Sequence, residues 1–184
     1  MHVVTGTARG TNLYTLEDDS IRPTSQRIKE AEFSTIQFHV AGARVLDLFA
    51  GTGQMGIEAL SRGALSAVFV DNNDEAISVL RRNIEKTKFL DKAKIIKSDA
   101  FRYLFGLKTL FDIAFIDPPY RLNIANRIVR LIGPNISTGG FVLCETELGA
   151  DMPSETDDLQ LSKQYKYGKI MIWLYRKNAK DGEE

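Results

Sequence analysis

The segment RVLDLFAGTGQMG, residues 44–56, indicates the fold, because a short apolar run passes directly into a glycine-rich turn. Continuous apolar runs of this length are typical of buried strands, and glycines permit a tight connection to a helix. Four similar runs follow, separated by intervals that can hold helices: residues 66–71, 93–98, 111–117 and 141–145. This alternation predicts an α/β fold with a parallel sheet covered on both faces.

The intervals and the two ends of the chain complete the expected order of elements. Apolar spacing and capping residues predict helices over residues 24–39, 53–62, 74–84, 100–105 and 123–132. Two short strands joined by a turn are expected within residues 2–14, and a closing pair of strands over residues 159–165 and 169–175.

The composition narrows the functional classes. The 184 residues contain 24 Lys+Arg and 24 Asp+Glu, which excludes a strongly basic nucleic-acid coat protein and an acidic disordered chain. The single cysteine, Cys144, excludes an internal disulfide, and its apolar neighbours predict a buried structural thiol. The start MHVVTGTARG lacks an apolar leader, and no apolar run nears the about 18 residues of a membrane span. We therefore expect a cytoplasmic monomer without metal or membrane contact.

The glycine-rich turn is a candidate cofactor site. Gly51, Gly53 and Gly56 have the Gly-x-Gly-x-x-Gly spacing of a dinucleotide-binding turn, and Asp71 follows about 20 residues later. Such a turn either holds a ligand at the helix N-terminus or joins strand to helix without one. Asp47 distinguishes between two kinds of cofactor. Its carboxylate is unfavourable beside the anionic pyrophosphate of a dinucleotide and favourable beside a cofactor that carries an ammonium or sulfonium group.

Acidic residues end three successive predicted strands: Asp47, Asp71 and Asp99. Asp71 and Asp99 either bind a ligand or cap the helices that follow them, and for each alone the two roles have equal weight. Because the carboxyl ends of parallel strands meet at one edge, the three acids together favour a binding crevice.

The segment FIDPPY, residues 115–120, is the most specific signal in the chain. Two prolines fix the backbone and remove two N–H donors, so the loop presents acceptors, namely the Asp117 carboxylate and the Pro118 carbonyl. These acceptors suit a planar group that carries an NH₂, with Tyr120 stacked on its ring. The alternative is a proline-rich turn without chemical function.

Both loops resemble motifs of known enzymes. D-L-F-A-G-T-G, residues 47–53, resembles the first motif of S-adenosylmethionine-dependent methyltransferases, which implies that cofactor. The implied cofactor-binding residues are Asp47, Phe49, Gly51, Gly53, Asp71, Asn72, Asp99 and Ala100. The loop after residue 116 resembles the Asp/Asn-Pro-Pro-aromatic motif of amino-group methyltransferases. The implied catalytic residues are Asp117, Pro118, Pro119 and Tyr120.

A longer resemblance covers residues 2–176. It rests on VVTGTARGTNL (3–13), IRPTSQRIKEAEF (21–33), VLDLFAGTGQMGIEALSRGA (45–64) and the late Tyr-Gly-Lys at 167–169. With these segments the chain resembles the RsmD family of bacterial 16S ribosomal RNA guanine-N2 methyltransferases. The resemblance implies a Rossmann-like class I methyltransferase fold, a seven-stranded and mostly parallel sheet whose last strand is antiparallel.

The RsmD resemblance also implies how the chain is divided into functional parts. The expected parts are an RNA-side hairpin and helix (1–40), the methyltransferase domain (41–177) and a frayed tail (178–184). The implied reaction is methyl transfer to the N2 amino group of a guanine in small-subunit ribosomal RNA. The implied substrate contacts are Arg9, Arg22, Thr24 and Arg27, whereas Lys29 is expected on the solvated surface.

Other functions remain open from sequence. A methyltransferase acting on DNA adenine or protein glutamine shares the loop motif, although glutamine enzymes favour Asn at position 117 and DNA enzymes usually carry a recognition domain. A nicotinamide-dependent oxidoreductase shares the glycine spacing. A non-catalytic ribosome-binding protein shares the fold, but has no need of Asp117 and Tyr120.

Overall fold

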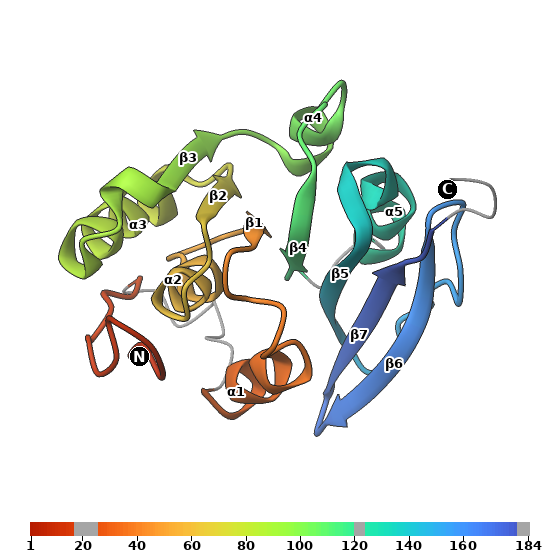
Figure 1. Ribbon diagram of the computed structural model, residues 1–184, viewed down its shortest axis with the longest axis horizontal. Helices are drawn as coiled ribbons and strands as arrows, with labels where there is room; N and C mark the ends of the chain where they lie inside the picture. Colours follow the sequence, from red (N-terminus) through yellow and green to blue (C-terminus); the bar gives the residue numbers. More distant parts are fainter. Residues whose placement is uncertain (17–25, 120–123, 180–184) are drawn as a thin grey trace.

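The apolar runs and the closing strands form one seven-stranded sheet in a computed structural model that describes residues 1–16, 26–119 and 124–179. The strand order is β3-β2-β1-β4-β5-β7-β6 (Figure 1). The strands are β1 (Arg44–Leu48), β2 (Ser66–Asp71), β3 (Ala93–Lys97), β4 (Phe111–Ile116), β5 (Ile136–Glu147), β6 (Leu159–Tyr167) and β7 (Ile170–Lys177). The helices are α1 (Gln26–Thr35), α2 (Gln54–Ser61), α3 (Asp74–Thr87), α4 (Ala100–Leu104) and α5 (Ile124–Ile132), with short 3₁₀ turns η1 (Leu90–Lys92) and η2 (Gly133–Asn135).

The pairing of the strands confirms the expected sheet. Strands β1 to β5 pair in parallel, and β7 is antiparallel to both of its neighbours, β5 and β6. The order reverses between β1 and β4, since β1 pairs with β2 on one side and with β4 on the other. In such sheets a ligand crevice lies beyond the carboxyl ends of the strands at this switch point.

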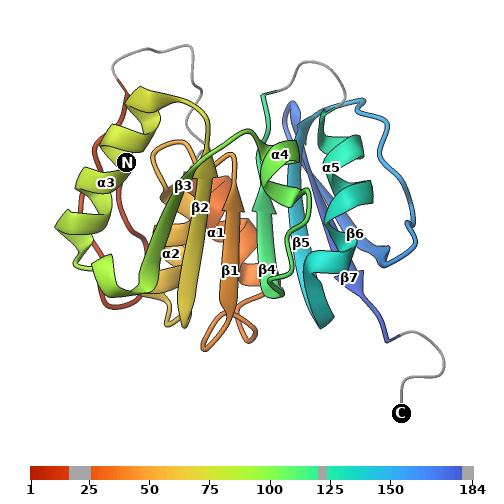
Figure 2. The same cartoon turned by 90° about the horizontal axis from the view of Figure 1, so that it is seen from above.

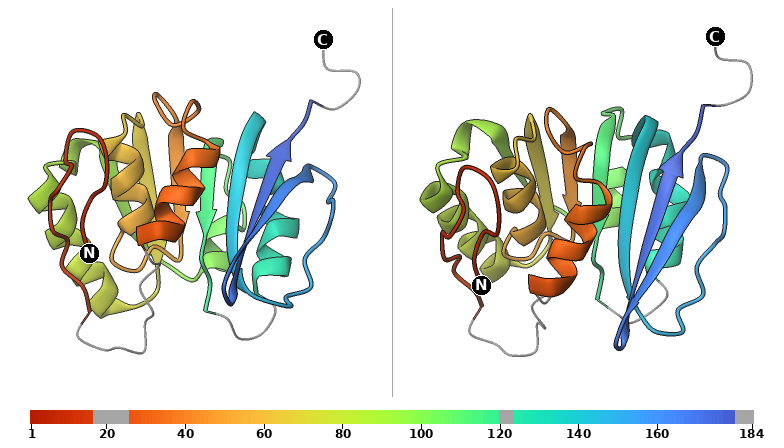
Figure 3. Two further views of the ribbon diagram at one scale, coloured as in Figure 1. Left: turned by 90° about the horizontal axis from the view of Figure 1, so that it is seen from below. Right: turned by 60° about the horizontal axis from the view of Figure 1, so that its bottom comes forward.

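Helices cover both faces of the sheet (Figures 2 and 3). Core contacts place α1, α2 and α3 on one face, and α4 and α5 on the other. Val45 belongs to the first core, whereas Leu46 and Leu48 belong to the second. Because alternate strand residues point to opposite faces, Asp47 points toward α1 and α2. No helix in the described part of the chain has both the length and the apolar character to cross a membrane.

The N-terminal segment differs from the expected pair of strands. Within residues 1–16 it forms an isolated antiparallel bridge between His2 and Asn12. Its two arms are joined by backbone hydrogen bonds, from the Val3 N–H to the Thr11 carbonyl and from the Leu13 N–H to the Met1 carbonyl. The turn between them bonds to α2, where the Thr5 N–H donates to the Glu58 carboxylate and the Ala8 N–H to the Ser61 hydroxyl. The segment is therefore attached to the helix layer by side chains.

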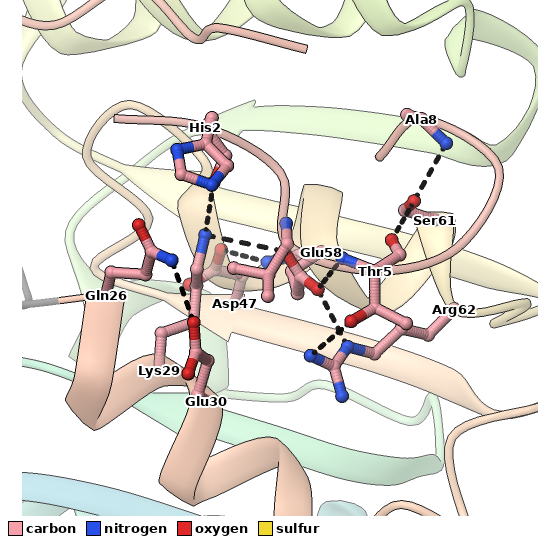
Figure 4. Close-up of polar contacts among 12 residues, drawn as sticks. His2, Thr5, Ala8, Gln26, Lys29, Glu30, Asp47, Glu58, Ser61 and Arg62 are labelled. Carbon is pink, nitrogen blue, oxygen red and sulfur yellow. Dashed lines mark hydrogen bonds and ion pairs between the residues drawn. The ribbon is translucent and has the colours of Figure 1, made fainter. Parts of the chain in front are cut away.

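Lys29 was expected on the solvated surface, and this expectation is wrong. The Lys29 side chain is 1% exposed, its Nζ donates to the His2 carbonyl at 2.9 Å, and it lies 3.4 Å from Glu58 Oε2. Glu58 is fully buried and also accepts hydrogen bonds from Arg62 Nε and the Val4 N–H, each at 2.8 Å (Figure 4). Lys29 therefore joins α1, α2 and the N-terminal segment through a buried ion pair.

The bounds of α1 and β5 also differ from the expectation. Helix α1 ends at Thr35 rather than at residue 39, since the His39 N–H bonds to the Ile36 carbonyl in a turn. Strand β5 begins at Ile136, before Gly139 and Gly140 and five residues before the predicted run at residues 141–145. Gly139 has a positive φ of 79°, and the β4–β5 register shifts over this region, so the glycines form an irregularity inside the strand.

Candidate active site

The loop after β1 takes an unusual backbone conformation. Phe49, Gly51 and Gly53 all have positive φ, at 69°, 53° and 86°. The N–H groups of Phe49 and Ala50 both donate to the Val70 carbonyl at 3.0 Å, which turns the loop onto the end of β2. A left-handed Phe is strained, because its Cβ crowds the backbone, so packing must hold it in place.

Asp71 fixes the glycine loop to the end of β2. Its Oδ2 accepts from the Gly51 N–H at 2.7 Å, and its Oδ1 accepts from the Asn73 N–H at 2.9 Å. The capping alternative for Asp71 is wrong, since the side chain of Asn73 caps α3 by accepting from the Ala76 N–H. A carboxylate has about four acceptor sites, so Asp71 retains capacity for ligand hydroxyls.

Asp99 has the capping role that the sequence allowed. Its Oδ1 accepts from the Arg102 N–H at 3.0 Å and caps α4, whose first residue, Ala100, is buried. Asp99 and Asn72 are both exposed at the carboxyl edge of the sheet. Their contact with an adenine stays a prediction.

Asp47 lies under the glycine loop and is 4% exposed. Burial raises the pKa of Asp47 to about 7; the Gly56 N–H, which donates to Oδ2 at 2.8 Å, opposes the shift, and the charge of Asp71 adds to it. Asp47 therefore changes its charge near neutral pH, where a cationic ligand would favour the carboxylate form.

Replacing Asp47 with Asn should stabilise the ligand-free protein above neutral pH. Because the folded-state pKa exceeds the unfolded value near 4, charging Asp47 costs stability as the pH rises from about 4 to about 7. We expect Asp47→Asn to match the wild type at pH 4 and to exceed its free energy of unfolding by roughly 2–4 kcal/mol at pH 8. Urea unfolding at both pH values measures this difference. Equal stabilities at pH 8 would contradict it.

The loop after β4 begins at the same edge of the sheet. Asp117 is half-buried, Pro118 is buried and Pro119 is exposed. Ile116 pairs with Cys144, so Asp117 lies level with Glu145 on β5. Tyr120 lies outside the described residues, and so do the predicted substrate contacts Arg22 and Thr24.

Two acids at this edge were missed by the sequence reasoning: Glu145 and Glu32. Glu145 is 4% exposed, and Glu32, on α1, is 5% exposed. The pKa of Glu32 is raised well above its usual range by burial, and further by the charges of Glu145, Asp117 and Asp47. Glu145 is the last residue of a predicted strand, so its position was a usable signal, whereas Glu32 has no distinguishing pattern. No three acidic, His or Cys side chains of the described residues are grouped to hold a metal ion.

The other predicted residues lie as follows. Arg9 and Arg27 are exposed, on the N-terminal segment and on α1. Cys144 is fully buried inside β5, in agreement with a structural thiol.

Two features of the glycine loop fit a bound cofactor. Gln54 Oε1, at the start of α2, is buried without a hydrogen-bond partner among the described residues. A Cβ added to Gly51 would meet nothing within 4 Å, so space is open beside the loop. An orphaned acceptor and an open backbone suit a ligand that carries N–H or O–H donors.

Comparison with known proteins places these features in a family. A family model described as "Conserved hypothetical protein 95" matches residues 1–176. The Bacillus subtilis protein named "Putative rRNA methyltransferase YlbH" is 33% identical, covering 97% of this chain and all of that protein. The Escherichia coli "Ribosomal RNA small subunit methyltransferase D" is 27% identical, covering 97% and 91% of the two chains. The solved structure titled "Putative methyltransferase yhhF from Escherichia coli" is 27% identical with a TM-score of 0.88, covering 98% and 99%.

The strand order, the antiparallel β7 and the two loops define a Rossmann-like class I methyltransferase fold. The chain belongs to the family described as "Conserved hypothetical protein 95", which confirms the RsmD-like methyltransferase expected from the sequence.

Proposed function

We propose that the protein transfers a methyl group from S-adenosylmethionine to the exocyclic N2 amino group of a guanine in small-subunit ribosomal RNA. The observation that carries this proposal is the Asp117-Pro118-Pro119 loop, which leaves β4 at the same sheet edge as the glycine loop after β1. The name of the Escherichia coli relative, a small-subunit ribosomal RNA methyltransferase, supports ribosomal RNA as the substrate.

The residues around the glycine loop would hold the cofactor. Asp71 would accept the ribose hydroxyls, and Asp47 would face the methionine end. The glycine backbone would pass beneath the cofactor, with Asn72, Asp99 and Ala100 beside the adenine. When bound, S-adenosylmethionine supplies an electrophilic methyl group on a cationic sulfur.

The loop after β4 would position the amino group. The Asp117 carboxylate and the Pro118 carbonyl would each accept one N–H and so draw the nitrogen lone pair out of conjugation with the ring. Tyr120, in the part of the loop that the structure leaves undescribed, would stack on the base. Such catalysis depends on positioning and electrostatics, and needs neither a metal nor a covalent nucleophile.

The contact with RNA would come from few charges. Arg9 and Arg27 are exposed, and Arg22 and Thr24 belong to the same N-terminal part. With a net charge of +0 for the whole chain, general attraction to RNA is weak. The target base would have to leave its stack to reach the sheet edge, which costs a few kcal/mol. We propose a cytoplasmic monomer that selects structured RNA by shape.

A direct assay tests the reaction. The protein is incubated with methyl-labelled S-adenosylmethionine and either 30S subunits or naked 16S RNA, both from cells that lack this enzyme. After digestion to nucleosides, the label is expected in N2-methylguanosine. Label in N6-methyladenosine or in glutamine of the protein fraction would favour the alternative amino-group substrates and contradict the proposal.

A further inference from the structure

The side chain of Asn83 lies between the N-terminal segment and the glycine loop, and the mechanism above does not use it. Asn83 belongs to α3 and is fully buried. Its Oδ1 accepts from the Tyr14 N–H at 2.7 Å, and its Nδ2 donates to the Tyr14 carbonyl at 3.1 Å and to the Thr52 carbonyl at 2.9 Å. One buried amide therefore links the N-terminal segment with the middle of the loop between Gly51 and Gly53.

The three partners allow only one orientation of the Asn83 amide. An asparagine side chain has an acceptor oxygen and an NH₂ with two hydrogens, and the oxygen and both hydrogens are used here. Turning the amide over would place its NH₂ against the Tyr14 N–H and its oxygen against two carbonyls. The backbone of Tyr14 therefore sets the direction in which Asn83 donates to Thr52.

The N-terminal segment is held against α3 beside this amide (Figures 2 and 3). Two cations of the helix lie over the Tyr14 ring, with Arg82 Cζ 4.1 Å and Lys86 Nζ 4.2 Å from its centroid. Leu13 is 6% exposed and belongs to the core on this face of the sheet. These contacts keep the Tyr14 backbone in place to orient Asn83.

The Thr52–Gly53 peptide group is fixed at both of its polar atoms. The Thr52 carbonyl accepts from Asn83. The Gly53 N–H donates to the Ala50 carbonyl at 2.7 Å. The loop also packs closely on α3 at this point, since a Cβ added to Gly53 would clash with the Leu80 side chain. Asn83 therefore fixes the peptide group at which the loop enters α2.

We propose that Asn83 is a positioning residue of the cofactor site, which holds the glycine loop in the conformation that binds S-adenosylmethionine and is itself oriented by the N-terminal segment. A loop that already has its bound conformation loses less conformational freedom when the ligand binds, and this raises affinity. The end of the N-terminal segment, at Tyr14, thereby serves the cofactor site as well as the expected RNA side. The inference rests on the cofactor site of the proposed function, and not on the identity of the methylated base.

Replacing Asn83 with alanine removes all three hydrogen bonds and tests this role. The dissociation constant for S-adenosylhomocysteine should rise about 10-fold, measured by calorimetry at a temperature where the variant is folded. In methyl transfer, the KM for S-adenosylmethionine should rise by a similar factor. The turnover at saturating cofactor should stay within about twofold of the wild type, because the loop that carries Asp117 is untouched.

Asn135→Ala is the matched control. Asn135 is 5% exposed, and its Nδ2 donates to the carbonyls of Leu107 and Thr109 at 2.8 and 3.3 Å. It lies directly before β5, at the opposite end of the sheet from the glycine loop. Its loss should lower the thermal midpoint, as the loss of Asn83 should, but leave the dissociation constant for S-adenosylhomocysteine at the wild-type value. An amide with only a structural role affects stability alone, so the two variants separate the two roles.

A second pair of variants tests the part of Tyr14 without opening the core. Tyr14→Pro removes the N–H that donates to Asn83, whereas Tyr14→Ala keeps this N–H and loses the ring. Tyr14 is 40% exposed, so both proteins should fold, and this pair decides the question if Asn83→Ala does not. The dissociation constant for S-adenosylhomocysteine should be about threefold higher in Tyr14→Pro than in Tyr14→Ala.

Three results would overturn the inference. The first is a folded Asn83→Ala protein that binds S-adenosylhomocysteine as tightly as the wild type. The second is an equal loss of affinity in Asn83→Ala and Asn135→Ala, because the loss then follows from stability alone. The third is equal affinity in Tyr14→Pro and Tyr14→Ala, because the N-terminal segment then does not orient the amide. Calorimetry needs no RNA, so these results stand whichever base is methylated, and a failure of the proposed function is recognised separately by the nucleoside assay.

Discussion

Replacing Asp117 with alanine should lower the rate of methyl transfer by about 100- to 1,000-fold and leave the affinity for S-adenosylhomocysteine unchanged. The carboxylate is the only side-chain acceptor in the Asp117-Pro118-Pro119 segment, since prolines carry no polar side-chain atoms. Its loss removes a contact that orients the amino group for reaction, whereas the glycine loop and Asp71 remain intact. Single-turnover transfer of labelled methyl groups and calorimetry with S-adenosylhomocysteine measure the two quantities.

Two further variants are compared with Asp117→Ala, a conservative replacement at the same position and a control elsewhere on β4. Asp117→Asn keeps one carbonyl acceptor and should lose less activity than the alanine variant. Asp112→Asn removes a carboxylate from the opposite end of β4, where Asp112 pairs with Arg44, and should keep wild-type turnover. Unchanged turnover in Asp117→Ala, with the cofactor still bound, would remove the basis of the proposed mechanism.

Replacing Glu58 with alanine should lower the free energy of unfolding by about 3–5 kcal/mol. Glu58 is fully buried and accepts from Arg62 and from the backbone of Val4 and Thr5, in addition to its ion pair with Lys29. Removing it leaves a lysine that is 1% exposed without its carboxylate and two backbone N–H groups without their acceptor. The pKa of Lys29 is already lowered by burial, an effect that Glu58 opposes.

Urea unfolding at pH 7 measures this loss. Glu85→Ala on the exposed side of α3 is the matched control, and it should change stability by no more than about 0.5 kcal/mol. If Glu58→Ala lowers the free energy of unfolding as little as the control does, the prediction is wrong and apolar packing alone accounts for the stability of this region.

Local sequence accounts for much of the fold and of the cofactor loop. Strand β2 has its predicted bounds, and the ends of β3 and β4 lie within one residue of prediction, because short apolar runs between glycines and caps define buried strands. The glycine loop was predictable for the same reason, since positive φ at Gly51 and Gly53 is a property of those residues. The rigid loop at Asp117-Pro118-Pro119 likewise depends on proline and not on distant contacts.

Burial of charged residues was not predictable in this way. Glu30 and Glu32 are two positions apart and so about 200° apart around the helix, but the sequence does not indicate which of the two faces the sheet. Lys29 resembles any surface lysine until Glu58 and His2 are brought to it from α2 and the N-terminus. Asp71 was weighed as a helix cap, yet its partners are the N–H groups of Gly51 and Asn73.

The positions of the strands, the glycine turn and the proline loop therefore follow from residues that act on their immediate neighbours, because backbone preference and apolar periodicity are local. The acidic character of the crevice does not. It arises because α1 packs across β4 and β5 and brings Glu32 to the same face as Asp47, Asp117 and Glu145. Burial depends on the assembled face and not on the order of residues along the chain, so only the folded molecule shows which carboxyl groups meet.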